Sequence, residues 1–225
     1  MQLYVDSANI NEIRHAASLG VISGVTTNPS LLAKEDPTVD VKQRILEIYQ
    51  TVGGHLSVEV VSTDTAGMLK EAEGILSWFP EATIKIPMIE AGLAAVKELS
   101  RQNIPTNVTL IFSPTQALAA NNAGASYVSV FLGRLDDLAQ DGVQVVEEVC
   151  EIWDRHGLES QIIAASIRHP MHILQCAKAG ADIATVPYKA LMQSLKHPLT
   201  DSGLQSFLKD YEKMQAEKAK LNANG

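Results

Sequence analysis

A single lysine interrupts an otherwise apolar segment, "ATIKIP" at residues 82–87. The β-branched and apolar neighbours predict a short buried strand, which would place the Lys85 ammonium away from water. Burying an unpaired ammonium is costly, so such a lysine is paired, reaches solvent with its tip, or loses its proton. A deprotonated lysine is a nucleophile toward carbonyl groups, so Lys85 is the first candidate for chemistry.

Further polar residues recur on one face of the predicted strands. Side chains alternate between two faces along a strand, and in residues 56–60 the apolar side chains lie opposite Ser57 and Glu59. Residues 127–131 alternate in the same way, with Ser129 and Phe131 on one face. The polar face obtained in this way carries Asp6, Thr26, Asn28, Glu59, Lys85, Asn107, Thr109, Ser129, Ser166 and Arg168.

Eight strand-like segments alternate with helical patterns along the 225 residues. The segments begin at residues 2, 24, 56, 82, 104, 127, 162 and 183, and a helical example is "VQVVEEVCEIW" at 143–153. This alternation predicts an α/β fold with a parallel sheet. Eight βα units of this length fit a single (β/α)₈ TIM barrel domain spanning residues 1–225, although spacing alone also permits a doubly wound sheet.

In such a barrel the polar face lines the lumen, and active sites lie at its C-terminal mouth. Adjacent parallel strands are about 4.8 Å apart, so Glu59 lies within reach of Lys85, directly or through one water. A structural salt bridge is the alternative, but the cluster with Asp6 favours function. The lysine could form a Schiff base with a ketone, Glu59 and Asp6 could transfer protons, and asparagine and serine could hold sugar hydroxyls.

An anion site is predicted beside this cluster. Arg134 follows the sixth predicted strand, and Ser166 with Arg168 closes the seventh. Two arginines and a hydroxyl suit a phosphate group, and barrel phosphate sites often use these late loops. A salt bridge from Arg134 to Asp136 or Asp137 is the alternative for that arginine.

Composition and charge narrow the classes of partner. With 26 acidic and 18 basic residues the formal net charge is -8, which argues against nucleic acid or an anionic membrane. Two cysteines and no long apolar run predict a cytoplasmic protein without disulfides or membrane helices. His169 and His172 have the spacing of a metal pair, but no third ligand is apparent, so we expect neither a metal nor a cofactor.

Five motifs resemble the transaldolase family, in order and at matching intervals: "GVTTNPSLL" from residue 24, "IKIP" from 84, "NVTLIFS" from 107, "GRLDD" from 133 and "AASIR" from 164. The resemblance extends from Asp6 to about residue 220 and is closest to the short members, which include fructose-6-phosphate aldolases. It implies a (β/α)₈ barrel with the Schiff-base lysine on the fourth strand. The segment after the lysine departs from the family at Ile89, where a serine or threonine is expected, and at Glu90.

The resemblance also implies roles. Lys85 would be the nucleophile, Glu59 and Thr109 would support a catalytic water, and Asp6 would take the C4 hydroxyl proton. Binding of the dihydroxyacetone unit and of the phosphate would involve Thr26, Asn28, Asn107, Ser129, Phe131, Arg134, Ser166 and Arg168. Glu59, Ser129 and Phe131 are similar to transaldolases, whereas the aldolases have glutamine, alanine and tyrosine there. A tyrosine hydroxyl could help to protonate and release the bound unit, and Phe131 cannot.

The resemblance implies a transferase of the pentose phosphate pathway that moves a dihydroxyacetone unit from a ketose phosphate to an aldose phosphate. The alternatives are a fructose-6-phosphate aldolase, a non-enzymatic sugar-phosphate-binding barrel with an inert Lys85–Glu59 pair, and, less favoured, an isomerase with Glu59 as base. The C-terminal segment has an apolar stripe of Leu204, Phe207, Leu208, Tyr211 and Met214, which predicts an amphipathic helix that covers either its own barrel or a neighbouring subunit. Similar short transaldolases assemble through this helix, which implies a homo-oligomer, a decamer of two pentameric rings.

Overall fold

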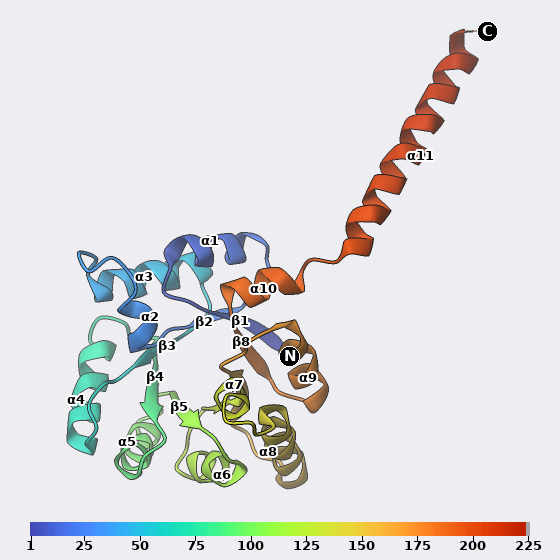
Figure 1. Cartoon of the computed structure of the whole chain (residues 1–225). Helices are drawn as coiled ribbons and strands as arrows, with labels where there is room; N and C mark the ends of the chain where they lie inside the picture. The colour runs from blue at the N-terminus through green and yellow to red at the C-terminus, as the bar shows by residue number, and fades with distance from the viewer. Residues whose placement is uncertain (224–225) are drawn as a thin grey trace. The chain divides into compact units, whose positions relative to one another are not determined.

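The computed structural model describes residues 1–223, in which eight parallel strands close into a barrel in chain order (Figure 1). The strands are β1 (Gln2–Asp6), β2 (Gly24–Thr26), β3 (His55–Glu59), β4 (Thr83–Pro87), β5 (Thr106–Ile111), β6 (Tyr127–Phe131), β7 (Gln161–Ala165) and β8 (Ile183–Pro187). The helices are α1 (Ile10–Ser18), α2 (Pro29–Leu32), α3 (Val41–Val52), α4 (Thr65–Leu76), α5 (Glu90–Arg101), α6 (Pro114–Asn122), α7 (Leu132–Asp136), α8 (Gly142–His156), α9 (Pro170–Ala179), α10 (Tyr188–Ser194) and α11 (Pro198–Ala223). The predicted (β/α)₈ barrel is confirmed, and a doubly wound sheet is excluded because β1 pairs with β8.

The chain divides into two compact units, residues 1–191 with the barrel and residues 192–225. In the second unit α11 is one continuous helix of 26 residues, so the predicted C-terminal helix is present. Among residues 1–223 no helix is both long and apolar enough to cross a membrane.

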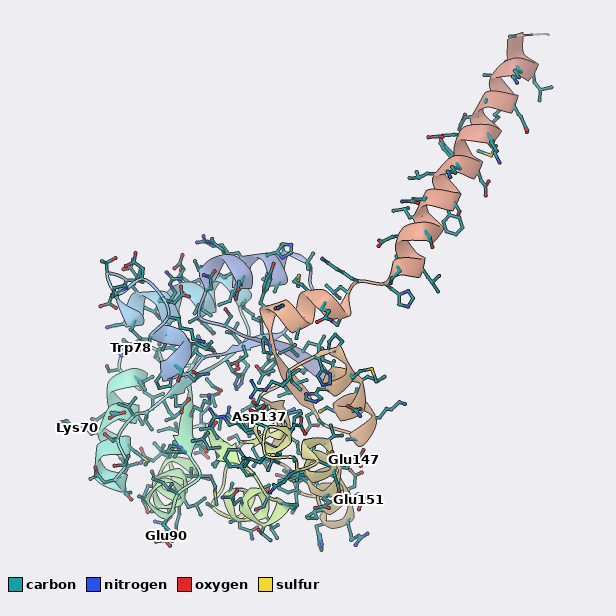
Figure 2. The ribbon with its side chains drawn as sticks, viewed as in Figure 1. Lys70, Trp78, Glu90, Asp137, Glu147 and Glu151 are labelled. Atoms are coloured by element: carbon teal, nitrogen blue, oxygen red, sulfur yellow. The ribbon has the colours of Figure 1, made fainter. Side chains whose placement is uncertain are left out.

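The helices around the barrel cover its apolar outer face. Helix α8 is typical: the Asp141 side chain caps its first turn by accepting from Gln144 N, and Gly157 ends it in the left-handed conformation. Its predicted apolar face, which includes Val146 and Trp153, is buried. Glu147 and Glu151 lie on its outer side, so charge faces away from the barrel (Figure 2).

Three strands end earlier or less regularly than the alternation predicted. β2 ends at Thr26, and Asn28 caps the following helix instead of extending the strand. β7 ends at Ala165, and Ser166 has φ of 61°, so the expected alternation through Arg168 is wrong. In β5 the register shifts between Val108 and Ile111, where Leu110 has φ of 62°. Period-two alternation requires extended backbone, and a residue with positive φ breaks it.

Ile89, the departure from the family pattern, is the N-cap of α5 and makes no side-chain capping hydrogen bond. A serine at this position could accept from a backbone N–H of the first turn. We therefore expect Ile89→Ser to raise the free energy of unfolding by about 1 kcal/mol, measured by denaturant unfolding. Ile89→Ala is the matched control, and an equal gain in that variant would mean that capping is not the cause.

The N-terminal end of the lumen is filled by aromatic rings. The ring of His55 stacks on Tyr4 with centroids 5.1 Å apart and meets the edge of Tyr127 at 4.5 Å. Burial lowers the pKa of His55 to about 4 and raises the pKa of both tyrosines. All three rings are therefore uncharged at neutral pH.

This shift predicts a loss of stability in acid. Because the pKa of His55 is about 4 in the folded chain and about 6.5 unfolded, its contribution is fully present above pH 6.5 and disappears as the pH falls to 4. We expect a contribution of about 2 kcal/mol, reduced from the value for full burial because the ring is partly exposed. The free energy of unfolding should decrease between pH 7 and pH 4.5, and this decrease should be smaller in His55→Phe than in the wild type. His156→Gln, at an exposed histidine, is the control; an unchanged decrease in His55→Phe would refute the assignment.

Candidate active site

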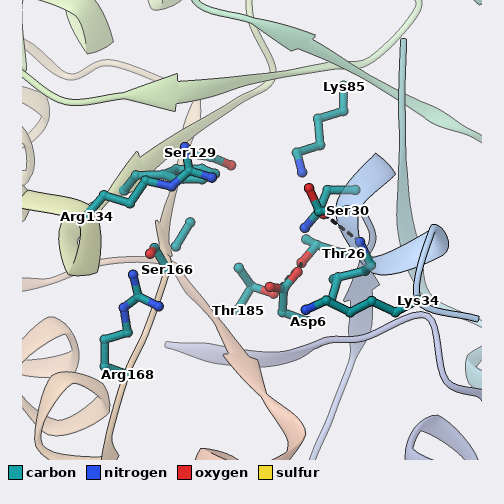
Figure 3. A pocket seen from close by; sticks show the side chains of 14 residues that line it. Asp6, Thr26, Ser30, Lys34, Lys85, Ser129, Arg134, Ser166, Arg168 and Thr185 are labelled. Carbon is teal, nitrogen blue, oxygen red and sulfur yellow. Dashed lines mark hydrogen bonds between the residues drawn. The ribbon is translucent and has the colours of Figure 1, made fainter. Parts of the chain in front are cut away.

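A cavity of about 320 Å³ opens at the C-terminal ends of the strands. Nine residues that the sequence predicted for the site line it: Asp6, Thr26, Asn28, Lys85, Ser129, Phe131, Arg134, Ser166 and Arg168. Figure 3 shows the Lys85 side chain pointing into the cavity, with Arg134 and Arg168 on one side and Lys34 on the other. One concave site therefore contains the lysine, a carboxylate and the two arginines.

Lys85 is held by two acceptors. Its Nζ lies 2.9 Å from Glu59 Oε2 and 3.0 Å from the carbonyl oxygen of Thr27, and the side chain is only 5% exposed. The predicted Glu59–Lys85 contact is thus present, and the barrel register sets the two residues opposite each other on β3 and β4. An amine that has lost one proton can still donate to both acceptors, which leaves its lone pair available to attack a carbonyl.

Asp6 is fixed by a short ladder of hydroxyls. Thr26 Oγ1 donates to Asp6 Oδ1 at 2.8 Å and lies 2.5 Å from Thr185 Oγ1. Since Thr26 has one proton and gives it to the carboxylate, Thr185 is the donor of the second bond. Burial raises the pKa of Asp6, and the Lys85 charge opposes this effect only in part. A carboxylate with a raised pKa is a stronger base than an ordinary aspartate, which suits the transfer of a proton.

The amide side chains of the site have fixed orientations. Asn28 Oδ1 accepts from Leu31 N at 3.0 Å and so caps α2, which leaves its NH₂ group available in the cavity. Asn107 Oδ1 accepts from Ser129 Oγ at 2.7 Å. Asn107 itself is fully buried, so it acts on the cavity through Ser129.

The arginines are positioned by different partners. Arg168 Nη2 lies 2.6 Å from Asp137 Oδ2, and the Arg134 guanidinium lies 5.1 Å from the centre of the Phe131 ring. Among the residues that the structure describes, no ion pair joins Arg134 to Asp136 or Asp137, so that alternative is wrong. Asp136 instead accepts from Gly142 N and contacts His172 Nε2 at 3.1 Å.

The backbone leaves no space beside Arg168. A Cβ at Gly133 would lie 2.1 Å from the Ser166 carbonyl oxygen and 2.8 Å from Arg168 Nε, so only glycine fits there. The close approach of Gly133 to Ser166 brings α7 and the turn after β7 together. Both arginines consequently face the same end of the cavity (Figure 3).

Three predicted site residues lie behind the cavity wall and not on it: Glu59, Asn107 and Thr109. Glu59 pairs with Lys85, Asn107 bonds to Ser129, and Thr109 Oγ1 is buried without a hydrogen-bond partner among the described residues. The sequence interpretation missed Ser30, Lys34 and Thr185, which line the cavity. Thr185 has the parity of a lumen residue in "IATVP" and could have been found by extending the alternation to β8. Within residues 1–223 no group of three metal-ligating side chains is present.

The fold and site define a barrel enzyme with a lumenal lysine, and comparison with known proteins identifies its family. Residues 3–225 match the Transaldolase/Fructose-6-phosphate aldolase family, so the chain belongs to this family. It is 57% identical to a probable transaldolase of Alkaliphilus metalliredigens over 212 residues, covering 94% of this chain and 98% of the relative. It is 56% identical to one from Clostridium botulinum (strain Eklund 17B / Type B) over 214 residues, 95% and 99% of the two chains. A probable transaldolase of Geobacillus kaustophilus is 52% identical over 215 residues, 96% and 100% of the two chains. The family predicted from the motifs is confirmed.

Proposed function

We propose that this protein is a transaldolase that moves a dihydroxyacetone unit between sugar phosphates through a Schiff base on Lys85. The observation that carries the proposal is the buried Lys85 Nζ, 2.9 Å from Glu59, in a cavity that also contains Asp6 and two arginines. A ketose phosphate such as fructose 6-phosphate or sedoheptulose 7-phosphate would place its carbonyl at Lys85 and its phosphate between the arginines. Glyceraldehyde 3-phosphate or erythrose 4-phosphate would be the acceptor.

Each side chain has a role that follows from its position. Lys85 attacks the ketone, and Glu59 and Thr109 support the water that enters and leaves; the Thr109 hydroxyl has no hydrogen-bond partner among residues 1–223. Asp6 removes the C4 hydroxyl proton while the C3–C4 bond breaks, and returns it to the acceptor. Asn28 and Ser129 hold hydroxyls of the three-carbon unit, and Arg134, Ser166 and Arg168 hold the phosphate.

Phe131 favours transfer over aldol cleavage with release. The bound three-carbon unit leaves as free dihydroxyacetone only after it is protonated, and Phe131 has no hydroxyl that could assist this step. Its ring packs against Phe112 with centroids 5.9 Å apart and lies beside Arg134. A fructose-6-phosphate aldolase is therefore the second candidate.

The test is the dependence of turnover on an acceptor. With fructose 6-phosphate alone we expect consumption to be at least about a hundredfold slower than with erythrose 4-phosphate added. Equal rates, with free dihydroxyacetone accumulating, would assign the aldolase reaction instead. No turnover of either kind, in protein that binds the sugar, would favour a non-enzymatic barrel.

The proposal extends to assembly and location. The exposed apolar stripe of α11 supports a homo-oligomer, which we propose is a decamer of two pentameric rings. The relatives are named probable transaldolases, and this name supports a place in the pentose phosphate pathway, which we propose operates in the cytoplasm. We propose these as properties of the transaldolase; sedimentation of the full chain tests the assembly.

A further inference from the structure

A chain of side-chain hydrogen bonds runs through the lumen from the N-terminal end of the barrel to the cavity. His55 Nε2 lies 2.7 Å from Ser57 Oγ, and Asn107 Nδ2 donates to the same Ser57 Oγ at 3.1 Å. Asn107 Oδ1 then accepts from Ser129 Oγ at 2.7 Å. Ser57 and Asn107 are fully buried, and Ser129 lines the cavity. The chain therefore connects a residue of the site with a histidine that lies outside its lining.

The number of protons on each group determines which group donates and which accepts in each hydrogen bond of this chain. Ser129 has one hydroxyl proton and donates it to Asn107, so only its lone pairs remain for the cavity. Asn107 donates through its NH₂ group to Ser57, whose own proton then needs an acceptor. His55 Nε2 is at hydrogen-bonding distance from Ser57, and it can accept only if the imidazole proton is on Nδ1.

The surroundings of His55 keep its ring neutral, as this arrangement requires. The ring packs between Tyr4 and Tyr127, which are uncharged, and burial lowers its pKa to about 4. A neutral imidazole has one bare nitrogen, and the neighbouring Ser57 hydroxyl decides which one it is. The opposite tautomer would donate from Nε2 to Ser57, turn the Asn107 amide round and make Ser129 a donor toward the cavity.

We propose that His55 and Ser57 are positioning residues: His55, with its proton on Nδ1, orients the Asn107 amide so that Ser129 offers an acceptor oxygen to a hydroxyl of the three-carbon unit. Neither residue touches the substrate. The part of this inference that concerns the substrate rests on the proposed transaldolase function. The part that concerns the tautomer rests on the hydrogen-bond geometry alone.

The tautomer is tested first, in the free protein, by a long-range ¹⁵N–¹H correlation spectrum of the ¹⁵N-labelled full chain at pH 7. The set of imidazole cross-peaks that is present in the wild type and absent from His55→Gln is assigned to His55. We expect a neutral ring with Nδ1 protonated and Nε2 bare. A proton on Nε2, alone or together with Nδ1, overturns the proposal whatever the enzyme catalyses.

Two substitutions at the same position then separate positioning from packing. His55→Phe keeps a ring between the tyrosines but removes the acceptor, and His55→Gln supplies a carbonyl acceptor but removes the ring. We expect the KM for fructose 6-phosphate to rise about tenfold in His55→Phe and to stay within about twofold of the wild type in His55→Gln, although the Tm falls further in His55→Gln. The reverse order of KM values would mean that the ring acts by packing, and would overturn the proposal.

Breaking the hydrogen-bond chain at another residue should raise KM in the same way. Ser57→Ala should raise KM as much as His55→Phe, and the double variant should be no worse than either, because both break the same connection. Tyr127→Phe, which keeps the ring and removes only its hydroxyl, is the matched control with wild-type KM. Full additivity of the two variants would contradict the proposal. Borohydride trapping of Lys85 in the wild type distinguishes a failure of the proposed function from a failure of the positioning role. If the expected tautomer is found but Lys85 carries no adduct, only the proposed transaldolase function is rejected.

Discussion

Replacement of Lys85 by methionine should abolish turnover, with a loss of at least about 10³-fold in kcat. The reason is chemical, because the variant has no amine to form the covalent link to the ketone. In the wild type, borohydride reduction with fructose 6-phosphate should leave a dihydroxyacetone-derived mass on the peptide that contains Lys85. The variant should carry no such mass.

The substitution also removes the counterion of Glu59. Lys85→Met would leave a largely buried carboxylate unpaired, which costs about 3 kcal/mol of folding free energy. Lys85→Arg is the matched control, since it keeps a cation beside Glu59 and cannot form the imine. Both variants should be inactive, and Lys85→Arg should be the more stable of the two. An adduct that persists in either variant, for instance on Lys34 in the same cavity, would assign the nucleophile to another residue.

Replacement of Arg168 by alanine should raise the KM for a phosphorylated acceptor by about a hundredfold. The guanidinium faces the end of the cavity that Arg134 also faces, so it supplies charge-assisted hydrogen bonds to a phosphate there. With saturating fructose 6-phosphate, KM is compared for glyceraldehyde 3-phosphate and for unphosphorylated glyceraldehyde. The second value should change by no more than about threefold, because that acceptor has no group for Arg168 to bind.

Asp137→Asn is a second variant with the opposite expectation. Asp137 holds Arg168 at 2.6 Å in an exposed ion pair, and such pairs contribute at most about 1 kcal/mol. Its removal should lower the KM for glyceraldehyde 3-phosphate by about twofold. Arg155→Ala, at an exposed residue of α8, should leave both KM values unchanged. An equal rise for the two acceptors in Arg168→Ala would place the phosphate elsewhere.

The central pair of the site could be predicted because it depends on strand geometry. Glu59 and Lys85 each lie on a short regular strand with clear alternation, and adjacent parallel strands place such residues side by side. The lumen positions of Asn107 and Ser129 follow from the same rule. The positions of these four residues could be predicted without knowing the course of any loop, and all four lie on the lumen face that the alternation predicted.

The phosphate end could be predicted only in part. Ser166 and Arg168 do reach the cavity, but by a turn with positive φ at Ser166 and not by continuation of β7. The partner of Arg168, Asp137, lies 31 residues away on another turn, so no local pattern connects them. Lys34 follows α2, whose course depends on packing, and its place in the cavity had no sequence signal.

The ladder from Thr185 through Thr26 to Asp6 has a consequence for how the enzyme is made. Asp6 lies on the first strand and Thr185 on the last, so the ladder is complete only when the two ends of the barrel meet, whereas its Thr26–Asp6 bond joins β1 and β2. During synthesis the Lys85–Glu59 pair can form long before β8 leaves the ribosome, whereas the hydrogen bond from Thr185 to Thr26 cannot. We therefore expect a nascent chain to reach full activity only after the barrel closes, so the appearance of full activity would report that final folding event.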